Sequence, residues 1–242
     1  ALEQRGHRWA TDSDSEVVVH AYEEEGVDFV RHLNGIFAFA IWDERNRRLV
    51  AARDALGVKP LYWWTDGRRV ALASEIGALI HAGLVTPSVD RVALDHYLAC
   101  RFVPSPRTLF EGVRKLPPAS TLVVEQDGTP RLTSWREDPG APVAGNDDEL
   151  AIRLANAFAD AVERQMMSDV PYGAFLSGGV DSAGVVAAMK QRSGTPPATF
   201  TIGFPGHGDV VDERALAAES ARIIGTEHRD TVMHETGFLT EL

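Results

Sequence analysis

The most informative stretch of this chain is Ser177-Gly178-Gly179-Val180-Asp181-Ser182. It follows a short apolar run at residues 173–176, typical of a strand, and precedes a small, apolar run at 183–189, typical of a helix. Glycines in a turn between a strand and a helix let the backbone approach an anion closely, and the helix start offers unpaired N–H groups with a partial positive charge. The stretch therefore predicts a phosphate-binding loop, in which the Ser177 and Ser182 hydroxyls are further donors.

Asp181 places a negative charge in this predicted anion loop. Such a carboxylate fits only if a cation lies between it and the phosphates, and from this we infer Mg²⁺. The Gly-Lys-Ser/Thr ending of the Walker loop is absent, so the pattern is a different one. The alternative is an ordinary strand-to-helix turn in which Asp181 or Ser182 caps the helix.

The second half of the chain alternates strands and helices. After the loop, residues 198–204 are expected to form a buried strand, 212–224 a helix closed by Gly225, and 229–233 a third strand. This order predicts right-handed crossovers and a parallel sheet. Ligands of such sheets bind beyond the carboxyl ends of the strands, which is where residues 177–182 lie.

The first half has the pattern of antiparallel hairpins, expected at residues 37–52, 61–73 and 120–135. Small or apolar residues on both faces of the first hairpin predict a sandwiched sheet. Helices are expected at residues 15–33, with a break at Gly26, and at 75–82 and 90–99.

A segment rich in Pro and Gly at residues 137–145 is the expected linker. Asn146 then opens a helix, with Glu149 as its capping partner. Five apolar residues at a spacing of four follow, and we expect them to pack in the core: Leu150, Leu154, Phe158, Val162 and Met166. The predicted fold class is α/β, with an α+β sandwich at residues 1–136 and a parallel-sheet domain at 146–242.

Composition narrows the class of protein. Of 242 residues, 44% are hydrophobic and 24% charged, which is ordinary for a soluble globular chain. The net charge of −11 argues against nonspecific binding to nucleic acid or to an anionic membrane, and no apolar run reaches the about 20 residues of a membrane span. Cys100 is the single cysteine, so a reducing, cytoplasmic setting is the simplest expectation. The eight histidines show no spacing typical of metal ligands.

Residues 177–182 resemble the pyrophosphate loop of ATP pyrophosphatases, and the longer run 167–182 resembles the glutamine-hydrolysing asparagine synthetases. Further stretches similar to that family follow one another in its order, at residues 13–16, 33–40, 53–62, 73–75 and 110–118. The resemblance implies an Ntn-hydrolase-like glutaminase domain at residues 1–136 and an ATP-pyrophosphatase-type synthetase domain at 146–242, hence a ligase of asparagine biosynthesis that uses glutamine as amido donor.

For the synthetase domain, the resemblance implies that the side-chain carboxylate of aspartate attacks the α-phosphate of ATP. Pyrophosphate then leaves, and ammonia displaces AMP from the adenylate. The nucleotide-binding residues that it implies are Leu176, Ser177, Gly178, Gly179, Asp181, Ser182 and Ile202. Asp181 would hold Mg²⁺, and Ile202 would form an apolar wall beside the adenosine, with plain strand core as the alternative. The implied substrates are glutamine, aspartate and ATP, and a homodimer is a candidate assembly.

For the glutaminase domain, the resemblance implies an N-terminal cysteine nucleophile whose own amino group is the base. Residue 1 is Ala here, so this chain carries no such nucleophile, and Cys100 is expected to be a buried structural thiol. Asp14 alone matches a glutamine-site residue, the aspartate that holds the substrate's α-ammonium, and a helix cap is its other interpretation. We expect the chain to be a middle portion of a longer enzyme.

Two other functions stay open. β-Lactam synthetases and peptide-cyclising relatives adenylate other carboxylates, and the residues that select the acceptor are expected beyond Leu242. A nucleotide-binding homologue without activity is disfavoured because the loop retains Asp181. Arg53, Asp54 and Glu75 also match family positions, and we expect them to form charge pairs between strands or domains.

Overall fold

The computed structural model describes residues 2–136, 140–204 and 212–233. They belong to two compact units, residues 1–140 and 141–242. Of the expected linker at 137–145, residues 137–139 lie outside the described part of the chain. Within the described part, no helix combines the length and the apolar character needed to cross a bilayer.

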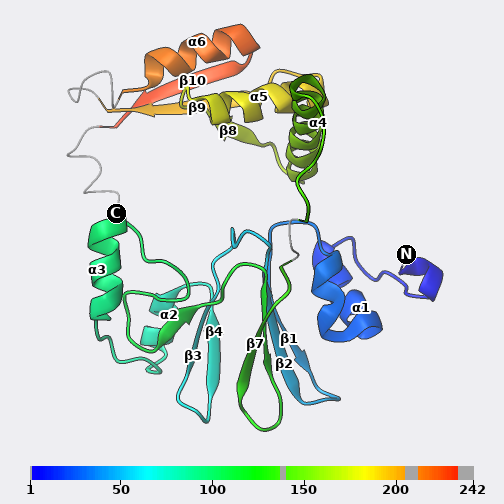
Figure 1. Ribbon diagram of the computed structural model, residues 1–242, viewed down its shortest axis with the longest axis vertical. Helices are drawn as coiled ribbons and strands as arrows, with labels where there is room; N and C mark the ends of the chain where they lie inside the picture. Colours follow the sequence, from blue (N-terminus) through cyan, green and yellow to red (C-terminus); the bar gives the residue numbers. More distant parts are fainter. Residues whose placement is uncertain (1, 137–139, 205–211, 234–242) are drawn as a thin grey trace. The chain divides into compact units, whose positions relative to one another are not determined.

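Two antiparallel sheets form the centre of the first unit (Figure 1). The first sheet has the strand order β1-β2-β6-β7 and the second the order β4-β3-β5. Their strands are β1 (Ala38–Asp43), β2 (Arg48–Arg53), β3 (Tyr62–Thr65), β4 (Val70–Ala73), β5 (Val113–Lys115), β6 (Ser120–Val124) and β7 (Pro130–Ser134). The helices are η1 (Glu3–Arg5), α1 (Asp14–Glu25), η2 (Gly26–His32), α2 (Ile76–His81) and α3 (Arg91–Cys100), where η marks a 3₁₀-helix.

The alternation of side chains along β2 and β3 sets the layers of this unit. Ala51 of β2 packs with Trp63 of β3 and forms the core between the two sheets. Its neighbour Ala52 points the other way and packs with Phe29 of η2, and residues of α1 cover the same face. On the far side of β3, Trp64 packs against a cluster that contains Leu79 of α2. The order of layers is therefore helix, sheet, sheet, helix, as Figure 1 shows from α1 to α2.

The second unit contains a three-stranded parallel sheet of order β10-β9-β8 (Figure 1). Its elements are α4 (Asp147–Gln165), β8 (Gly173–Phe175), α5 (Val180–Ser193), β9 (Ala198–Gly203), α6 (Arg214–Ile224) and β10 (Glu227–Val232). Leu176 at the end of β8, Val186 of α5 and Ala217 of α6 form one core, so both helices cover the same face of the sheet. The predicted parallel sheet is confirmed, and the mixed helix and sheet content agrees with the predicted α/β class.

Several helix caps follow the local sequence. The Asp90 carboxylate accepts hydrogen bonds from the backbone N–H groups of Val92 and Ala93 and starts α3. Asn146 and Glu149 form the expected capping box at the start of α4. At α1 the cap is Ser13, which accepts from Ser15 N, so the interpretation of Asp14 as the cap is wrong.

Three predictions about burial are wrong, because an apolar pattern in the sequence does not show what covers that face in the fold. On α4, Leu154 and Phe158 are 72% and 41% exposed, because within the described residues α4 packs mainly along α5 and a spacing of four drifts around the helix. In β9, Thr199 and Thr201 are buried whereas Phe200 and Ile202 are on the face away from α5 and α6, so the strand is half-buried. Cys100 is exposed at the last residue of α3, a helix in which only Ala93 is buried.

Candidate functional site

Residues 177–182 form a closed turn between β8 and α5. The Ser177 and Ser182 hydroxyls lie 2.9 Å apart, Ser182 Oγ accepts a hydrogen bond from Ser177 N at 3.2 Å, and Ser177 Oγ accepts one from Gly179 N at 3.3 Å. Gly179 is the N-cap of α5, so the N–H groups that follow it in the first turn have no partner within the helix. The turn thus directs free backbone donors and the positive end of the helix dipole outward, as anion binding requires.

Gly178 is the one position of this turn that only glycine fits. Its φ is +79°, and a Cβ built there would lie 2.6 Å from Leu216 Cβ and 2.9 Å from the Leu216 carbonyl carbon. The turn therefore lies directly against the first turn of α6. The start of α5 and the start of α6 consequently meet at the carboxyl edge of the sheet, where parallel sheets bind ligands.

Asp181 lies in the first turn of α5 and is exposed. In the described part of the chain, no hydrogen bond or ion pair engages its carboxylate. An ionised carboxylate beside serine hydroxyls is a hard oxygen donor set, which suits Mg²⁺ when phosphate oxygens and water complete the coordination. The residues of this turn therefore fit the metal that we expect from the sequence.

Leu176 and Ile202 have different positions relative to this turn. The Leu176 side chain is 1% exposed within the core, and its carbonyl accepts a hydrogen bond from Thr201 Oγ1, so only its backbone is near the turn. Ile202 is 37% exposed on the open face of the sheet, near the carboxyl end of β9. An apolar wall for a ligand is therefore available at Ile202, but not at the Leu176 side chain.

Arg214 is a residue that sequence analysis did not single out. It begins α6, two residues before Leu216, and its guanidinium pairs with Asp212 at 2.7 Å and with Asp230 at 3.6 Å. A Cβ on Gly203 would lie 2.2 Å from Arg214 Nε, so the Arg214 side chain passes close to the backbone at the end of β9. The charged residues 212–214 signal a polar site in the sequence, but their partner on β10 becomes visible only in the fold.

In the first unit, Asp14 lines a cavity of about 520 Å³ between α1, β1 and the segment before β3. The other polar side chains of the lining are Ser15, Lys59 and Ser74. One carboxylate and one ammonium group in a cavity of this size complement the α-ammonium and α-carboxylate of an amino acid. Cys100 is not among the lining residues.

Asp54 holds the chain segment that brings Lys59 to this cavity. Its carboxylate is 1% exposed and accepts hydrogen bonds from the backbone N–H groups of Leu56, Val58 and Lys59 at 3.0–3.1 Å. Arg53 donates to backbone carbonyls of the same segment, those of Gly57 and Lys59. The expected charge pairs at these two residues are therefore wrong, because both side chains are used to fix a loop.

We expect Asp54→Asn to destabilise the first unit by about 1–3 kcal/mol, because an amide cannot accept all three backbone donors. Burial alone would raise the pKa of Asp54, but these N–H donors outweigh it and lower the pKa below its ordinary 3.8. A lowered folded-state pKa means that the stabilisation is complete above pH 3.8 and is lost as the pH falls below it. Denaturant unfolding at several pH values should show the wild-type advantage shrinking in acid.

Asp95→Asn, at an exposed position of α3, is the matched control and should stay within about 0.5 kcal/mol of wild type at every pH. A wild-type advantage over Asp54→Asn that does not change with pH would contradict the anchoring role of the Asp54 carboxylate.

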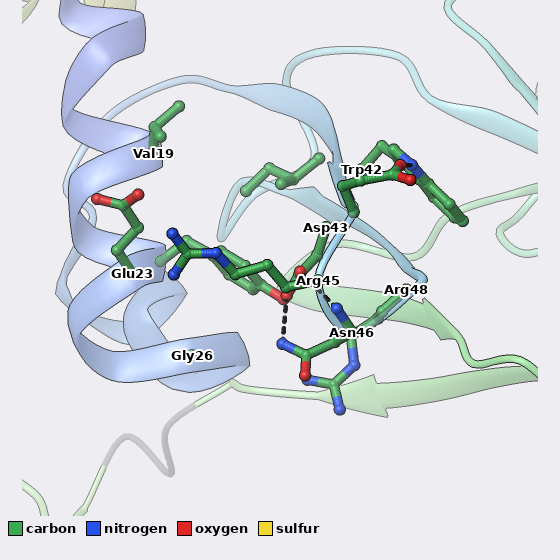
Figure 2. A pocket seen from close by; sticks show the side chains of 11 residues that line it. Val19, Glu23, Gly26, Trp42, Asp43, Arg45, Asn46 and Arg48 are labelled. Atoms are coloured by element: carbon green, nitrogen blue, oxygen red, sulfur yellow. Dashed lines mark hydrogen bonds between the residues drawn. The ribbon is translucent and has the colours of Figure 1, made fainter.

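A larger cavity of about 690 Å³ lies between α1 and the turn from β1 to β2 (Figure 2). One of its three carboxylates, that of Asp43, accepts hydrogen bonds from Tyr22 Oη at 2.7 Å and from the Asn46 backbone N and side-chain Nδ2 at 2.9 and 2.7 Å. These bonds, those from Asn46 first, lower the pKa of Asp43 to about 2. Because the Asp43 carboxylate closes the turn and the Glu44 carboxylate accepts from Trp42 Nε1, we assign no ligand to the cavity.

Comparison with known families adds an independent finding to this geometry. Residues 1–136 match the family model described as a glutamine amidotransferase domain, and the chain therefore belongs to that family. Residues 153–242 match a second model, described as asparagine synthase. Relatives that match along both parts of the chain include glutamine-hydrolysing asparagine synthetases.

One such relative is the glutamine-hydrolysing asparagine synthetase 1 of Bacillus subtilis, 35% identical over 241 residues, which covers 100% of this chain and 38% of that protein. Another is asparagine synthetase 3 of the same organism, 38% identical over 208 residues, covering 84% of this chain and 34% of that one. The enzyme of Asparagus officinalis is 34% identical, covering 93% and 34% respectively. The chain thus spans a little over a third of the length of these relatives.

Among solved structures, the chain is similar to a glutamine phosphoribosylpyrophosphate amidotransferase from B. subtilis. The identity is 14% and the TM-score 0.41, over 96% of this chain and 57% of that one.

Proposed function

We propose that this chain carries the glutamine site and the ATP site of a glutamine-dependent asparagine synthetase. In this reaction the side-chain carboxylate of aspartate is adenylated by ATP, and ammonia from glutamine displaces AMP. The observation that carries the proposal is the 177–182 turn, which stands at the carboxyl end of β8 with Gly178 pressed against α6. The relatives named above support aspartate as the acceptor over other carboxylates.

The nucleotide residues of the proposal are Leu176, Ser177, Gly178, Gly179, Asp181, Ser182 and Ile202. Backbone N–H groups at the start of α5 would face the departing pyrophosphate, and the two serine hydroxyls would turn from each other toward its oxygens. Asp181 would hold Mg²⁺, which neutralises phosphate charge when bound. The Ile202 side chain would contact the adenosine, and Leu176 would act through its backbone.

Asp14 is the glutamine-binding residue of the proposal. We expect Asp14→Asn to raise KM for glutamine about 10- to 100-fold, because an ionic hydrogen bond to the α-ammonium contributes about 1.5–3 kcal/mol. Activity with ammonia in place of glutamine should be unchanged. Steady-state kinetics with each nitrogen source measure both, and Asp12→Asn, at an exposed acid that does not line the cavity, is the control. An unchanged KM for glutamine would remove Asp14 from the site.

The experiment that tests the whole proposal uses the full-length protein that contains this chain. It is supplied with ATP, Mg²⁺ and aspartate, and with glutamine or ammonia, while pyrophosphate and asparagine are followed. We expect asparagine from both nitrogen sources, with one pyrophosphate released for each. Pyrophosphate release that requires another carboxylate would reject asparagine synthesis and retain the adenylating chemistry. No release with any carboxylate would leave a nucleotide-binding homologue.

The proposal includes glutamine, aspartate and ATP as small-molecule partners, a cytoplasmic setting and a homodimeric assembly, without nucleic acid or membrane. The negative net charge and the single cysteine support the setting. Sedimentation of the full-length protein tests the assembly.

A further inference from the structure

Three side chains with metal-ligand atoms converge where the N-terminal segment meets α1. His7 Nδ1 lies 2.9 Å from His20 Nδ1, and Glu23 Oε2 lies 4.0 Å from the first and 3.5 Å from the second. Tetrahedral zinc with bonds of about 2.0–2.1 Å separates neighbouring ligand atoms by about 3.3 Å. The three distances lie around that value, so one ion could reach all three atoms with small shifts.

The outer nitrogens of both histidine rings are bonded to carboxylates. His7 Nε2 lies 2.9 Å from Glu24 Oε1, and His20 Nε2 lies 3.2 Å from Glu16 Oε1. A carboxylate accepts, so each ring carries its proton on Nε2 and presents a lone pair at Nδ1. Metal-binding histidines are held in the same way, with the distal N–H donated to a carboxylate.

In this tautomer of both rings, the two inner nitrogens face each other as two lone pairs. Two lone pairs at 2.9 Å repel unless a cation or an additional proton lies between them. The neighbouring Glu23 carboxylate adds negative charge on the same side, which favours a divalent cation over an empty gap.

The surroundings fix the histidines and leave one side of the cluster open. Glu16, which holds His20, is itself fixed by the backbone N–H groups of Ala10 and Thr11, each at 2.7 Å. The two histidine side chains are 12% and 18% exposed, whereas Glu23 is 57% exposed. Figure 2 shows the Glu23 carboxylate turned away from the β1–β2 hairpin. Water can therefore reach a fourth coordination position from the Glu23 side.

We propose that His7, His20 and Glu23 bind one Zn²⁺ ion, with water as the fourth ligand. Two imidazoles and one carboxylate are a known ligand set for zinc. The ion fastens the segment before residue 13 to α1, the helix that begins at Asp14. The site is separate from the cavity that Asp14 lines, since none of its ligands lines that cavity.

His20 and Glu23 share one face of α1 because they are three residues apart. The third ligand comes from outside the helix, thirteen residues before His20. For this reason the spacing of the histidines in the sequence did not indicate a metal site. The fold indicates one because it brings His7 next to His20.

The test uses metal-free full-length protein without a polyhistidine tag, titrated with Zn²⁺ in competition with a chromogenic chelator. His20→Gln removes a ligand and should lower the Zn²⁺ affinity of this site at least about 100-fold. Glu24→Gln weakens the hydrogen bond that orients His7 and should lower the affinity about 10- to 100-fold. Glu23→Gln changes an exposed side chain, so it keeps the fold and should also weaken binding. His32→Gln is the matched control, a 73% exposed histidine bonded to Glu25 and outside the cluster, and should leave the affinity unchanged.

Co²⁺ in place of Zn²⁺ gives a second readout, because visible absorption of the tetrahedral ion should appear in wild type and in His32→Gln and vanish in His20→Gln. Zn²⁺ should also raise the Tm of wild type more than that of Glu23→Gln. Wild-type protein that takes up no Zn²⁺, or a His20→Gln variant that binds it as tightly as wild type, would overturn the proposal. The two rings would then share a proton instead.

Discussion

A Gly178→Ala variant is expected to lose about 2–5 kcal/mol of stability and to release pyrophosphate from ATP about 100-fold more slowly. A positive φ contributes about 1–2 kcal/mol of strain for a residue with a Cβ, and forcing a methyl group into a packed contact adds about 1–3 kcal/mol. A Cβ at position 178 would lie 2.6–3.0 Å from Leu216 Cβ, the Leu216 carbonyl carbon and the Ala217 nitrogen. Because backbone cannot rotate away, α6 or the turn must move, and a displacement of about 1 Å at a reacting group is enough for that loss of rate.

The control variant Gly194→Ala separates the effect of backbone strain from that of steric crowding. Gly194 ends α5 with a φ of +69°, but a Cβ there would meet nothing within 4 Å. We expect this control to cost about 1–2 kcal/mol and to retain full activity. Urea unfolding and the rate of pyrophosphate release of the full-length variants provide the comparison. Equal effects of the two substitutions would show that the approach of Gly178 to α6 has no role.

Short-range features of this fold could be predicted from the sequence, because their causes lie within a few residues. The caps at Asp90 and Asn146 are examples, since each side chain bonds to backbone two or three residues on. The parallel sheet of the second unit follows from the order of its elements together with the handedness of crossovers. The 177–182 turn was found for the same reason, as a local pattern between a strand and a helix.

Burial was harder to predict, because a pattern shows that a face is apolar and not what covers it. Leu154 and Phe158 form a stripe on α4, yet α5 covers only part of it. Phe200 and Ile202 alternate with buried threonines and are on the face of the sheet away from α5 and α6. Cys100 is apolar by type but ends a helix with a single buried residue.

Contacts between distant segments could not be predicted at all from one sequence. The need for glycine at position 178 depends on Leu216, which lies 38 residues further along the chain. Arg53 illustrates the same limit, because its charge indicated an ion pair whereas backbone carbonyls are its partners. In the candidate site, the turn at residues 177–182 could therefore be predicted from the sequence, whereas its contact with α6 could not.

Asp181→Asn is expected to reduce ATP-dependent pyrophosphate release by about 100- to 1000-fold while leaving the fold intact. The substitution removes the negative charge proposed to hold Mg²⁺ against the phosphates, and losing one charge-stabilising group of this kind costs about 2.7–4 kcal/mol in the transition state. Stability should change by less than about 0.5 kcal/mol, because the side chain is exposed. Pyrophosphate release at increasing Mg²⁺ concentration, with urea unfolding alongside, measures both effects, and excess Mg²⁺ should restore part of the lost rate.

Asp148→Asn is the matched control, since Asp148 is an exposed acid in the first turn of α4 within the same unit. Both substitutions remove one charge from the start of a helix, so both weaken the interaction with the helix dipole by the same few tenths of a kcal/mol. Only Asp181→Asn should alter the dependence on Mg²⁺. If the two variants released pyrophosphate equally well, the metal role of Asp181 would be rejected, and the carboxylate would merely complement the N-terminus of α5.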